Sequence, residues 1–158
     1  MARIYVSSSW KNNLQQSLVE ELRKRGHQVY DFRHSLADGK DECNVWKDVC
    51  QRLGLTRHRL SGTVLPGDFE RMVSDDEAVE RFNRHFSAMR EADTCILLLP
   101  CGRSSHAEAG FMKGEGKQVF VMDTGSVTVP ELMYRMFDGY FHDLECLYNA
   151  IDKVPNGR

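Results

Sequence analysis

The feature that most constrains the fold is an apolar run over residues 94–99, Thr-Cys-Ile-Leu-Leu-Leu, which ends in a Pro-Cys-Gly loop. The run is apolar on both faces of a pleated strand, as expected for the central strand of a parallel sheet that helices cover on both sides. The loop leads into a small-residue segment with one acid, Glu108, which is typical of a helix start. The run therefore predicts an α/β fold with its functional loops at the carboxyl ends of the strands.

The flanking segments alternate between strand and helix patterns. Further strands are predicted at residues 4–6, 27–32, 119–122 and 139–141, and further helices at 14–22, 45–53, 74–89, from 128 onward and at 144–151. Alternation of this kind indicates a three-layer α/β sandwich with a parallel sheet of four or five strands. The expected strand order is 2-1-3-4-5.

Length and composition fit one globular domain. The 158 residues are 41% apolar and 28% charged, enough to bury a proper core. The expected domain therefore spans residues 1–158 and carries an irregular insertion at about 33–73, where Gly, Asp, Arg and Pro break the periodicity. We expect this insertion to border the site as a lid or a substrate-facing segment.

Charge and cysteine usage disfavour several classes of partner. A net charge of −2, with scattered Lys and Arg, offers no footprint for nucleic acid or a membrane surface. No apolar run is as long as a membrane span, and the N-terminus does not resemble a signal peptide, so a cytoplasmic location is expected. Five cysteines without a CxxC pattern predict neither a disulfide framework nor a metal site, and no cofactor is expected.

The expected strand order brings two loops together. It places the topological switch point between the first and third strands, so residues 7–12 and 100–106 would face one crevice. Serine hydroxyls and free N–H groups at two helix N-termini, beside Arg103, suit a phosphate or sugar hydroxyls. The candidate substrate-binding residues in these loops are Ser7, Ser8, Ser9, Trp10, Gly102, Arg103, Ser104 and Ser105.

Several common motifs do not fit the sequence. Three serines follow the first strand where a dinucleotide fingerprint needs glycines, and the sequence around Lys117 is not a P-loop. His106 and Glu108 match the H-x-E of zinc deaminases, but the P-C-x-x-C that should follow is missing. Cys101 with His106 is a further, weaker candidate for a nucleophile and its base.

On its residues alone, Glu108 has two interpretations. Ser105-His106-Ala107-Glu108 has the pattern of a capping box, in which the glutamate merely closes the first turn of the helix. The same carboxylate on a first helical turn, beside hydroxyls, also suits catalysis.

Four short motifs resemble the nucleoside 2-deoxyribosyltransferase family and its nucleotide N-glycosidase relatives, and the similarity runs in the same order from residue 3 to about 135, apart from the irregular segment at 33–73. They are Arg3-Ile4-Tyr5-Val6-Ser7-Ser8-Ser9-Trp10, Ala92-Asp93, Glu108-Ala109-Gly110 and Gly116-Lys117-Gln118-Val119. The resemblance implies a flavodoxin-like sheet, an oligomer whose subunits complete each other's sites, and a glutamate nucleophile at Glu108. It also implies that Asp93 orients the sugar or the protonation network, whereas a polar residue that starts a strand is the alternative.

The chemistry implied is cleavage or transfer of the N-glycosidic bond of a nucleoside or nucleoside 5′-monophosphate through a covalent glycosyl-glutamate. Transferases of the family commonly carry an acid in the loop ahead of the nucleophile, and residues 101–105 contain none. Hydrolysis of a monophosphate is therefore favoured over base exchange. The alternative function is a non-catalytic nucleotide-binding or sensing module. The expected partners are the nucleoside or nucleotide and further copies of the chain.

Overall fold

The computed structural model describes residues 1–34, 45–55, 64–123, 125 and 131–154. They form two compact units. We call the unit of residues 1–32 and 88–158 the sheet unit, and the unit of residues 33–87 the helical unit.

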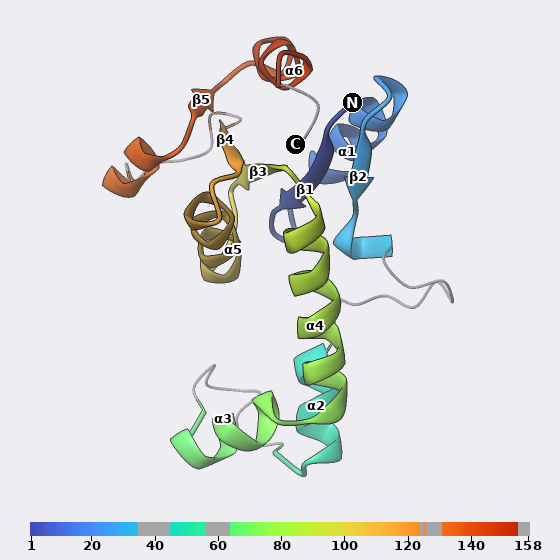
Figure 1. Cartoon of the computed structure of the whole chain (residues 1–158). Coiled ribbons are helices and arrows are strands. Elements are labelled where there is room, and N and C mark those ends of the chain that lie inside the picture. The colour runs from blue at the N-terminus through green and yellow to red at the C-terminus, as the bar shows by residue number, and fades with distance from the viewer. Residues whose placement is uncertain (35–44, 56–63, 124, 126–130, 155–158) are drawn as a thin grey trace. The chain divides into compact units, whose positions relative to one another are not determined.

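The sheet unit contains a five-stranded parallel sheet in the order β2-β1-β3-β4-β5 (Figure 1). Its strands are β1 Arg3–Ser7, β2 Gln28–Tyr30, β3 Thr94–Leu99, β4 Gln118–Asp123 and β5 Gly139–Phe141. All six residues of β3 are buried, as its apolar run predicts. The α/β class, the strand order and the flavodoxin-like arrangement are therefore confirmed.

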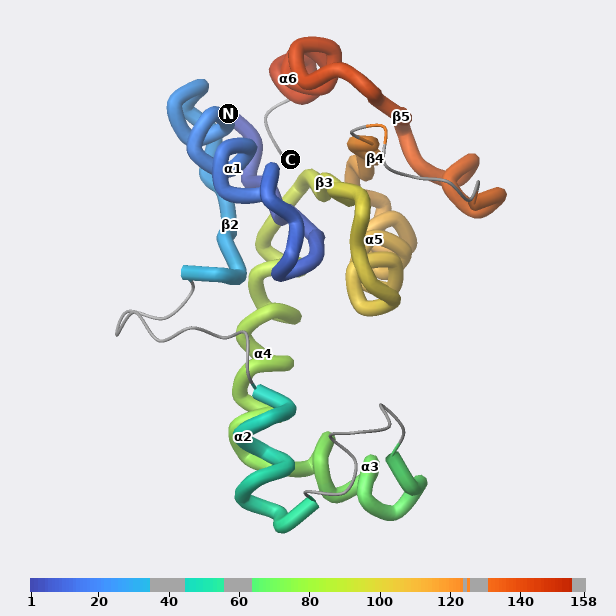
Figure 2. The backbone as a smooth tube through the Cα atoms, turned by 180° about the vertical axis from the view of Figure 1, so that it is seen from behind, coloured from blue at the N-terminus to red at the C-terminus, as the bar shows by residue number. Residues whose placement is uncertain are grey.

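Helices cover both faces of this sheet, with α1 and α6 on one side and α5 on the other (Figures 1 and 2). They span α1 Gln15–Lys24, α5 Arg103–Gly114 and α6 Leu144–Asp152. Side chains alternate along a strand, so Ile4 and Val6 join the core under α1 and α6. Tyr5 and Ser7 consequently point to the face that α5 covers.

The helix expected from residue 128 onward differs from what the structure shows. Residues 128–130, where a helix was expected to begin, lie outside the described residues. The residues that follow form a 3₁₀ helix, η4, over Leu132–Met136, and Glu131 caps it by accepting a hydrogen bond from the Met133 N–H. Over the described residues, no helix is long and apolar enough to cross a membrane.

The helical unit contains α2 Val45–Arg52, α3 Pro66–Val73 and the first part of α4 Asp76–Glu91, so the predicted helix at 45–53 is confirmed. A short 3₁₀ helix, η1 Phe32–His34, lies before α2 in the chain. Val49 and Met72 form part of a small core here. The prediction that residues 33–73 border the site stays a prediction.

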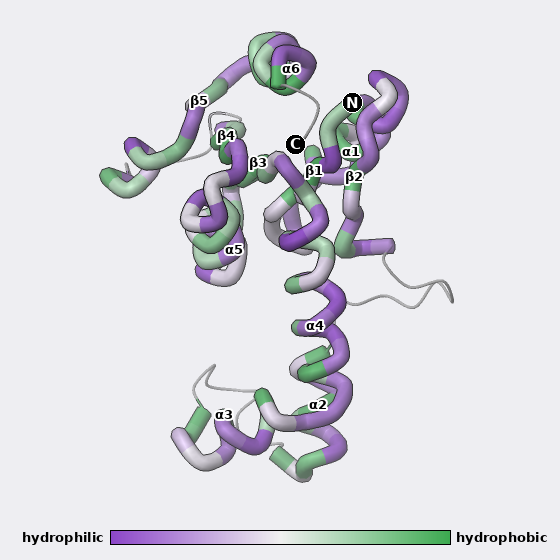
Figure 3. Tube along the Cα trace, in the orientation of Figure 1, coloured by the Kyte–Doolittle hydropathy of each residue, from purple (hydrophilic) through white to green (hydrophobic). Residues whose placement is uncertain are grey.

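Helix α4 is confirmed, but its apolar residues are not all buried. The helix is mostly hydrophilic along its length (Figure 3). Met89 is buried, whereas Val79 is 42% and Phe82 61% exposed. Phe82 stacks on Phe86 with ring centroids 5.4 Å apart. Helical periodicity therefore predicted the secondary structure of this segment better than its burial.

Candidate active site

Glu108 lies in the second turn of α5, because the helix begins at Arg103 with Gly102 as its N-cap. The expected position on the first turn is therefore wrong. The alternative interpretation as a capping box is wrong as well, since Ser105 already lies inside the helix and the N-cap has no side-chain hydrogen bond. The carboxylate of Glu108 does not close the helix start.

Two hydroxyl groups from β1 contact the Glu108 carboxylate. Ser7 Oγ donates a hydrogen bond to Glu108 Oε2. The Tyr5 phenol also hydrogen-bonds to Glu108. Tyr5 and Ser7 are two residues apart on one strand, so both face α5. Both are buried, at 1% and 0% exposure. The sheet thus presents two fixed hydroxyls to one half-buried carboxylate.

The phenol of Tyr5 stays protonated at neutral pH and so remains available as a donor. Burial raises the pKa of Tyr5 well above its usual range, and the negative charge of Glu108 raises it further. The ring is held in place by Tyr30 of β2, which stacks on it with centroids 5.4 Å apart and planes 9° from parallel.

The two loops predicted to share the switch point do meet. Ser8 Oγ donates to the Leu98 carbonyl at 3.1 Å, and Ser105 Oγ donates to the Ser8 carbonyl at 3.1 Å. Asn12 Nδ2 adds a hydrogen bond to the Pro100 carbonyl at 3.3 Å. The hydroxyl proton of Ser105 joins the two loops and that of Ser8 is donated to strand β3, so these groups are not available as phosphate donors in this arrangement.

The first turn of α5 supplies the exposed part of the site. Gly102, Arg103 and Ser104 are exposed at a helix N-terminus, where backbone N–H groups lack partners within the helix. Among the other loop candidates, Ser9 Oγ accepts a hydrogen bond from the Lys11 N–H at 3.2 Å. Trp10 is half-buried and packs edge-on against Phe32, with centroids 5.0 Å apart.

Asp93 lies at the opposite end of the sheet from Glu108, at the amino end of β3. The Arg3 N–H donates to both of its carboxylate oxygens at 3.1 Å, and Thr94 Oγ1 donates at 2.9 Å. Since Arg3 starts β1 and Ser7 ends it, Asp93 is separated from Glu108 by the length of that strand. Asp93 ties two strand starts together, and the structure does not bring it to the site.

Cys101 and His106 lie close together, but their geometry does not activate a thiolate. Cys101 Sγ is 3.6 Å from His106 Nδ1, while the same nitrogen is 2.9 Å from the Gly102 carbonyl. A carbonyl only accepts, so Nδ1 carries the hydrogen and cannot take a proton from the thiol. Nε2 is 2.9 Å from the Tyr134 hydroxyl. Burial raises the pKa of Cys101 to about 11.

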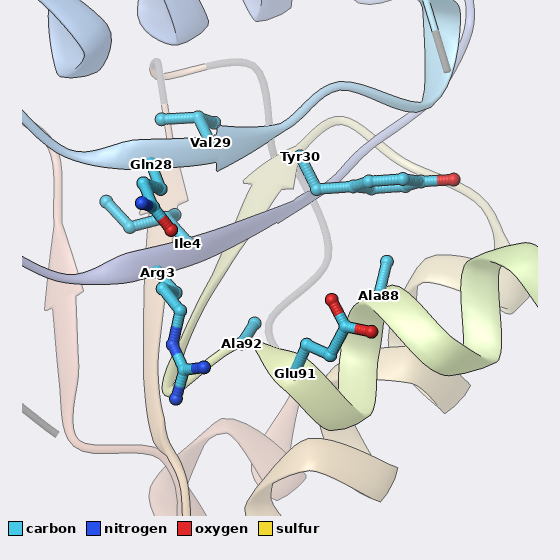
Figure 4. A pocket seen from close by; sticks show the side chains of 8 residues that line it. All are labelled: Arg3, Ile4, Gln28, Val29, Tyr30, Ala88, Glu91 and Ala92. Atoms are coloured by element: carbon cyan, nitrogen blue, oxygen red, sulfur yellow. The ribbon is translucent and has the colours of Figure 1, made fainter. Parts of the chain in front are cut away.

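A metal-binding cluster or a pocket among the described residues would also bear on the site. No group of three or more His, Cys, Asp or Glu side chains within this part of the chain is arranged to hold a metal ion. A depression of about 210 Å³ lies elsewhere in the sheet unit, between β1, β2 and the end of α4 (Figure 4). Its lining includes Arg3, Tyr30 and Glu91, and Glu108 is not part of it.

A solved structure of a 2-deoxyribosyltransferase from Bacillus psychrosaccharolyticus superimposes on this chain with a TM-score of 0.55. The match covers 97% of this chain and 92% of that chain at 18% sequence identity. This chain has the fold of a 2-deoxyribosyltransferase. The resemblance in the sequence is thereby confirmed as a likeness of fold. No protein family model matches the chain, and a search of curated proteins found no match.

Within this 2-deoxyribosyltransferase fold, Tyr5 is the site residue that sequence reasoning missed. The sequence places it only in a β-prone run. A usable signal was present, since a tyrosine in a buried central strand needs a partner for its hydroxyl and shares a face with Ser7 two residues on. That face could have been matched to the helix that carries Glu108.

Proposed function

We propose that this chain cleaves the N-glycosidic bond of a nucleoside or nucleoside 5′-monophosphate through a covalent glycosyl-Glu108 intermediate. One observation carries the proposal: the Glu108 carboxylate lies beside the carboxyl end of β1, held by the buried hydroxyls of Tyr5 and Ser7. In open parallel α/β sheets, ligands bind in the crevice outside the carboxyl ends of the strands. A carboxylate oriented by fixed donors is suited to nucleophilic attack.

The reaction proceeds in two displacements. A carboxylate oxygen of Glu108 forms a bond to C1′ of the sugar while the bond from C1′ to the base nitrogen breaks. The base leaves with that electron pair and takes a proton from water. A water molecule then attacks C1′, the ester bond breaks with its electrons returning to Glu108, and a proton is released to solvent. Two inversions give net retention at C1′.

The exposed first turn of α5 supports a phosphorylated substrate. Gly102, Arg103 and Ser104 combine helix N–H groups with a cation and a hydroxyl. Such a turn binds a 5′-phosphate without further donors. Because residues 101–105 contain no acid to serve an incoming base, we propose hydrolysis in preference to base exchange.

We further propose that the chain forms a homo-oligomer. In the sheet unit, η4 exposes three large apolar side chains, Leu132 at 75%, Met133 at 58% and Met136 at 42%. Apolar side chains grouped on a surface mark sites of protein contact. Light scattering at several concentrations should give a mass above that of one chain, and a monomer at every concentration would contradict this proposal.

The test is base release from a panel of nucleosides and their 5′-monophosphates. We expect free base with at least one substrate and loss of that activity in Glu108→Ala and Glu108→Gln. Glu115→Gln, an exposed carboxylate just after the same helix, is the matched control and should keep full activity. Binding that survives Glu108→Gln, with no base released by the unaltered protein, would favour the sensing module instead.

A further inference from the structure

Ser7 has one hydroxyl proton and two acceptors for it. Its Oγ lies within hydrogen-bond reach of Glu108 Oε2 and is 3.2 Å from the Ser105 backbone carbonyl. The residue is fully buried, so water cannot replace either partner. A hydroxyl donates one hydrogen bond at a time, and the better acceptor at each moment receives it.

We propose that Ser7 is a positioning residue that speeds the breakdown of the glycosyl-Glu108 ester. The proposal rests on the function proposed above. The free carboxylate is the stronger acceptor because it is charged, and hydrogen bonds to charged groups are about twice as strong as neutral ones. Ser7 therefore stabilises Glu108 more as a carboxylate than as an ester.

This difference acts on the second displacement. When water attacks C1′ and the ester bond breaks, negative charge returns to the Glu108 oxygens. The Ser7 hydroxyl strengthens its hydrogen bond as that charge develops, which lowers the barrier for ester breakdown. In the first displacement the Ser7 hydrogen bond has the opposite effect on the barrier, because it weakens as negative charge leaves the carboxylate. Ser7 thus favours release of the sugar over its capture.

The Ser105 carbonyl makes this exchange possible inside the protein. While Glu108 carries the sugar, its ester oxygen is a weak acceptor, and the Ser7 proton can turn to the Ser105 carbonyl. A carbonyl oxygen has two lone pairs, so it can accept from Ser7 as well as from its own helix. The buried Ser7 hydroxyl therefore stays paired in both states and does not itself oppose ester formation.

The experiment measures the sugar adduct directly in Ser7→Ala. Acid-quenched reactions with an active substrate are analysed by intact mass spectrometry, and the decay of the adduct is followed after dilution into buffer without substrate. We expect Ser7→Ala to carry more adduct at steady state and to lose it about 10-fold more slowly. Ser7→Cys, whose thiol is a weaker donor of similar size, should lie between Ser7→Ala and the unaltered protein.

Thr94→Val is the matched control, because it removes another fully buried hydroxyl of the same sheet, one that contacts Asp93. It should leave adduct level and decay unchanged. If the adduct decays as fast in folded Ser7→Ala or Ser7→Cys as in the unaltered protein, the role proposed for Ser7 is wrong. The proposed function is not affected by that result. Absence of base release in the unaltered protein overturns the proposed function itself.

Discussion

The hydrogen bond between Tyr5 and Glu108 should be measurable as stability. Tyr5→Phe removes one hydroxyl and keeps the ring, so the stack on Tyr30 and the burial of the ring remain. The loss is one hydrogen bond to a charged acceptor, worth about 1.5–3 kcal/mol. We expect the free energy of unfolding to fall by about 2 kcal/mol, and Tm by about 4–8 °C for a chain of this size.

A double-mutant cycle assigns this loss to Glu108. In a Glu108→Gln background the same hydrogen bond is neutral and worth about 1 kcal/mol, so Tyr5→Phe should cost about 1 kcal/mol less there. Urea unfolding followed by circular dichroism measures all four proteins. Tyr148→Phe, which removes the hydroxyl of another buried tyrosine, is the control, and its effect on the free energy of unfolding should be the same with Glu and with Gln at position 108.

Two results would show that the Tyr5 hydroxyl does not stabilise the protein through Glu108. One is a Tyr5→Phe protein whose unfolding free energy lies within about 0.5 kcal/mol of the unaltered one. The other is an equal loss with Glu108 and with Gln at position 108, since the hydroxyl would then not act through the carboxylate charge.

The remaining predictions concern pH and the end of one helix. Burial raises the pKa of Tyr5 in the folded protein, so the stability that its protonated phenol contributes is complete below about pH 10 and is lost as the pH rises further. The free energy of unfolding should therefore fall less steeply above about pH 10 in Tyr5→Phe than in the unaltered protein. Hydrogen bonds from Arg52 lower the pKa of Asp75, so protection of the α2 amides from hydrogen exchange should decline only as the pH falls below about 4, and less so in Arg52→Gln. Lys117 Nζ donates to the carbonyls of Met89 and Arg90 at the end of α4, so Lys117→Met should lower the free energy of unfolding by about 1 kcal/mol in urea titrations.

The sheet was predictable because its signals are local and agree with one another. The run at 94–99 is long enough and apolar enough to be a central strand, and helical patterns on both sides leave a parallel sheet as the consistent solution. The strand order then brought residues 7–12 and 100–106 together, as the hydrogen bonds from Ser105 to the Ser8 carbonyl and from Asn12 to the Pro100 carbonyl confirm.

The details of the site could not be predicted in the same way, because they depend on distances between loops and the sequence does not give these distances. The pattern at Ser105–Glu108 looks like a helix start, yet the helix begins earlier, at Arg103, so Ser105 is free to bond the facing loop. Asp93 stands beside the apolar strand in sequence, but a strand has two ends, and this acid precedes its strand while the site follows it. Which hydroxyls are used in joining the loops became visible only once both loops were placed.

In the proposed reaction Glu108 carries the sugar between the two displacements. Peptide mass mapping of an acid-quenched reaction tests it most directly, because the sugar leaves its mass on the residue that attacked C1′. We expect the added mass of one sugar on the peptide that contains Glu108, and none in Glu108→Gln. Base release with the sugar on another residue, or undiminished release by Glu108→Ala, would contradict it.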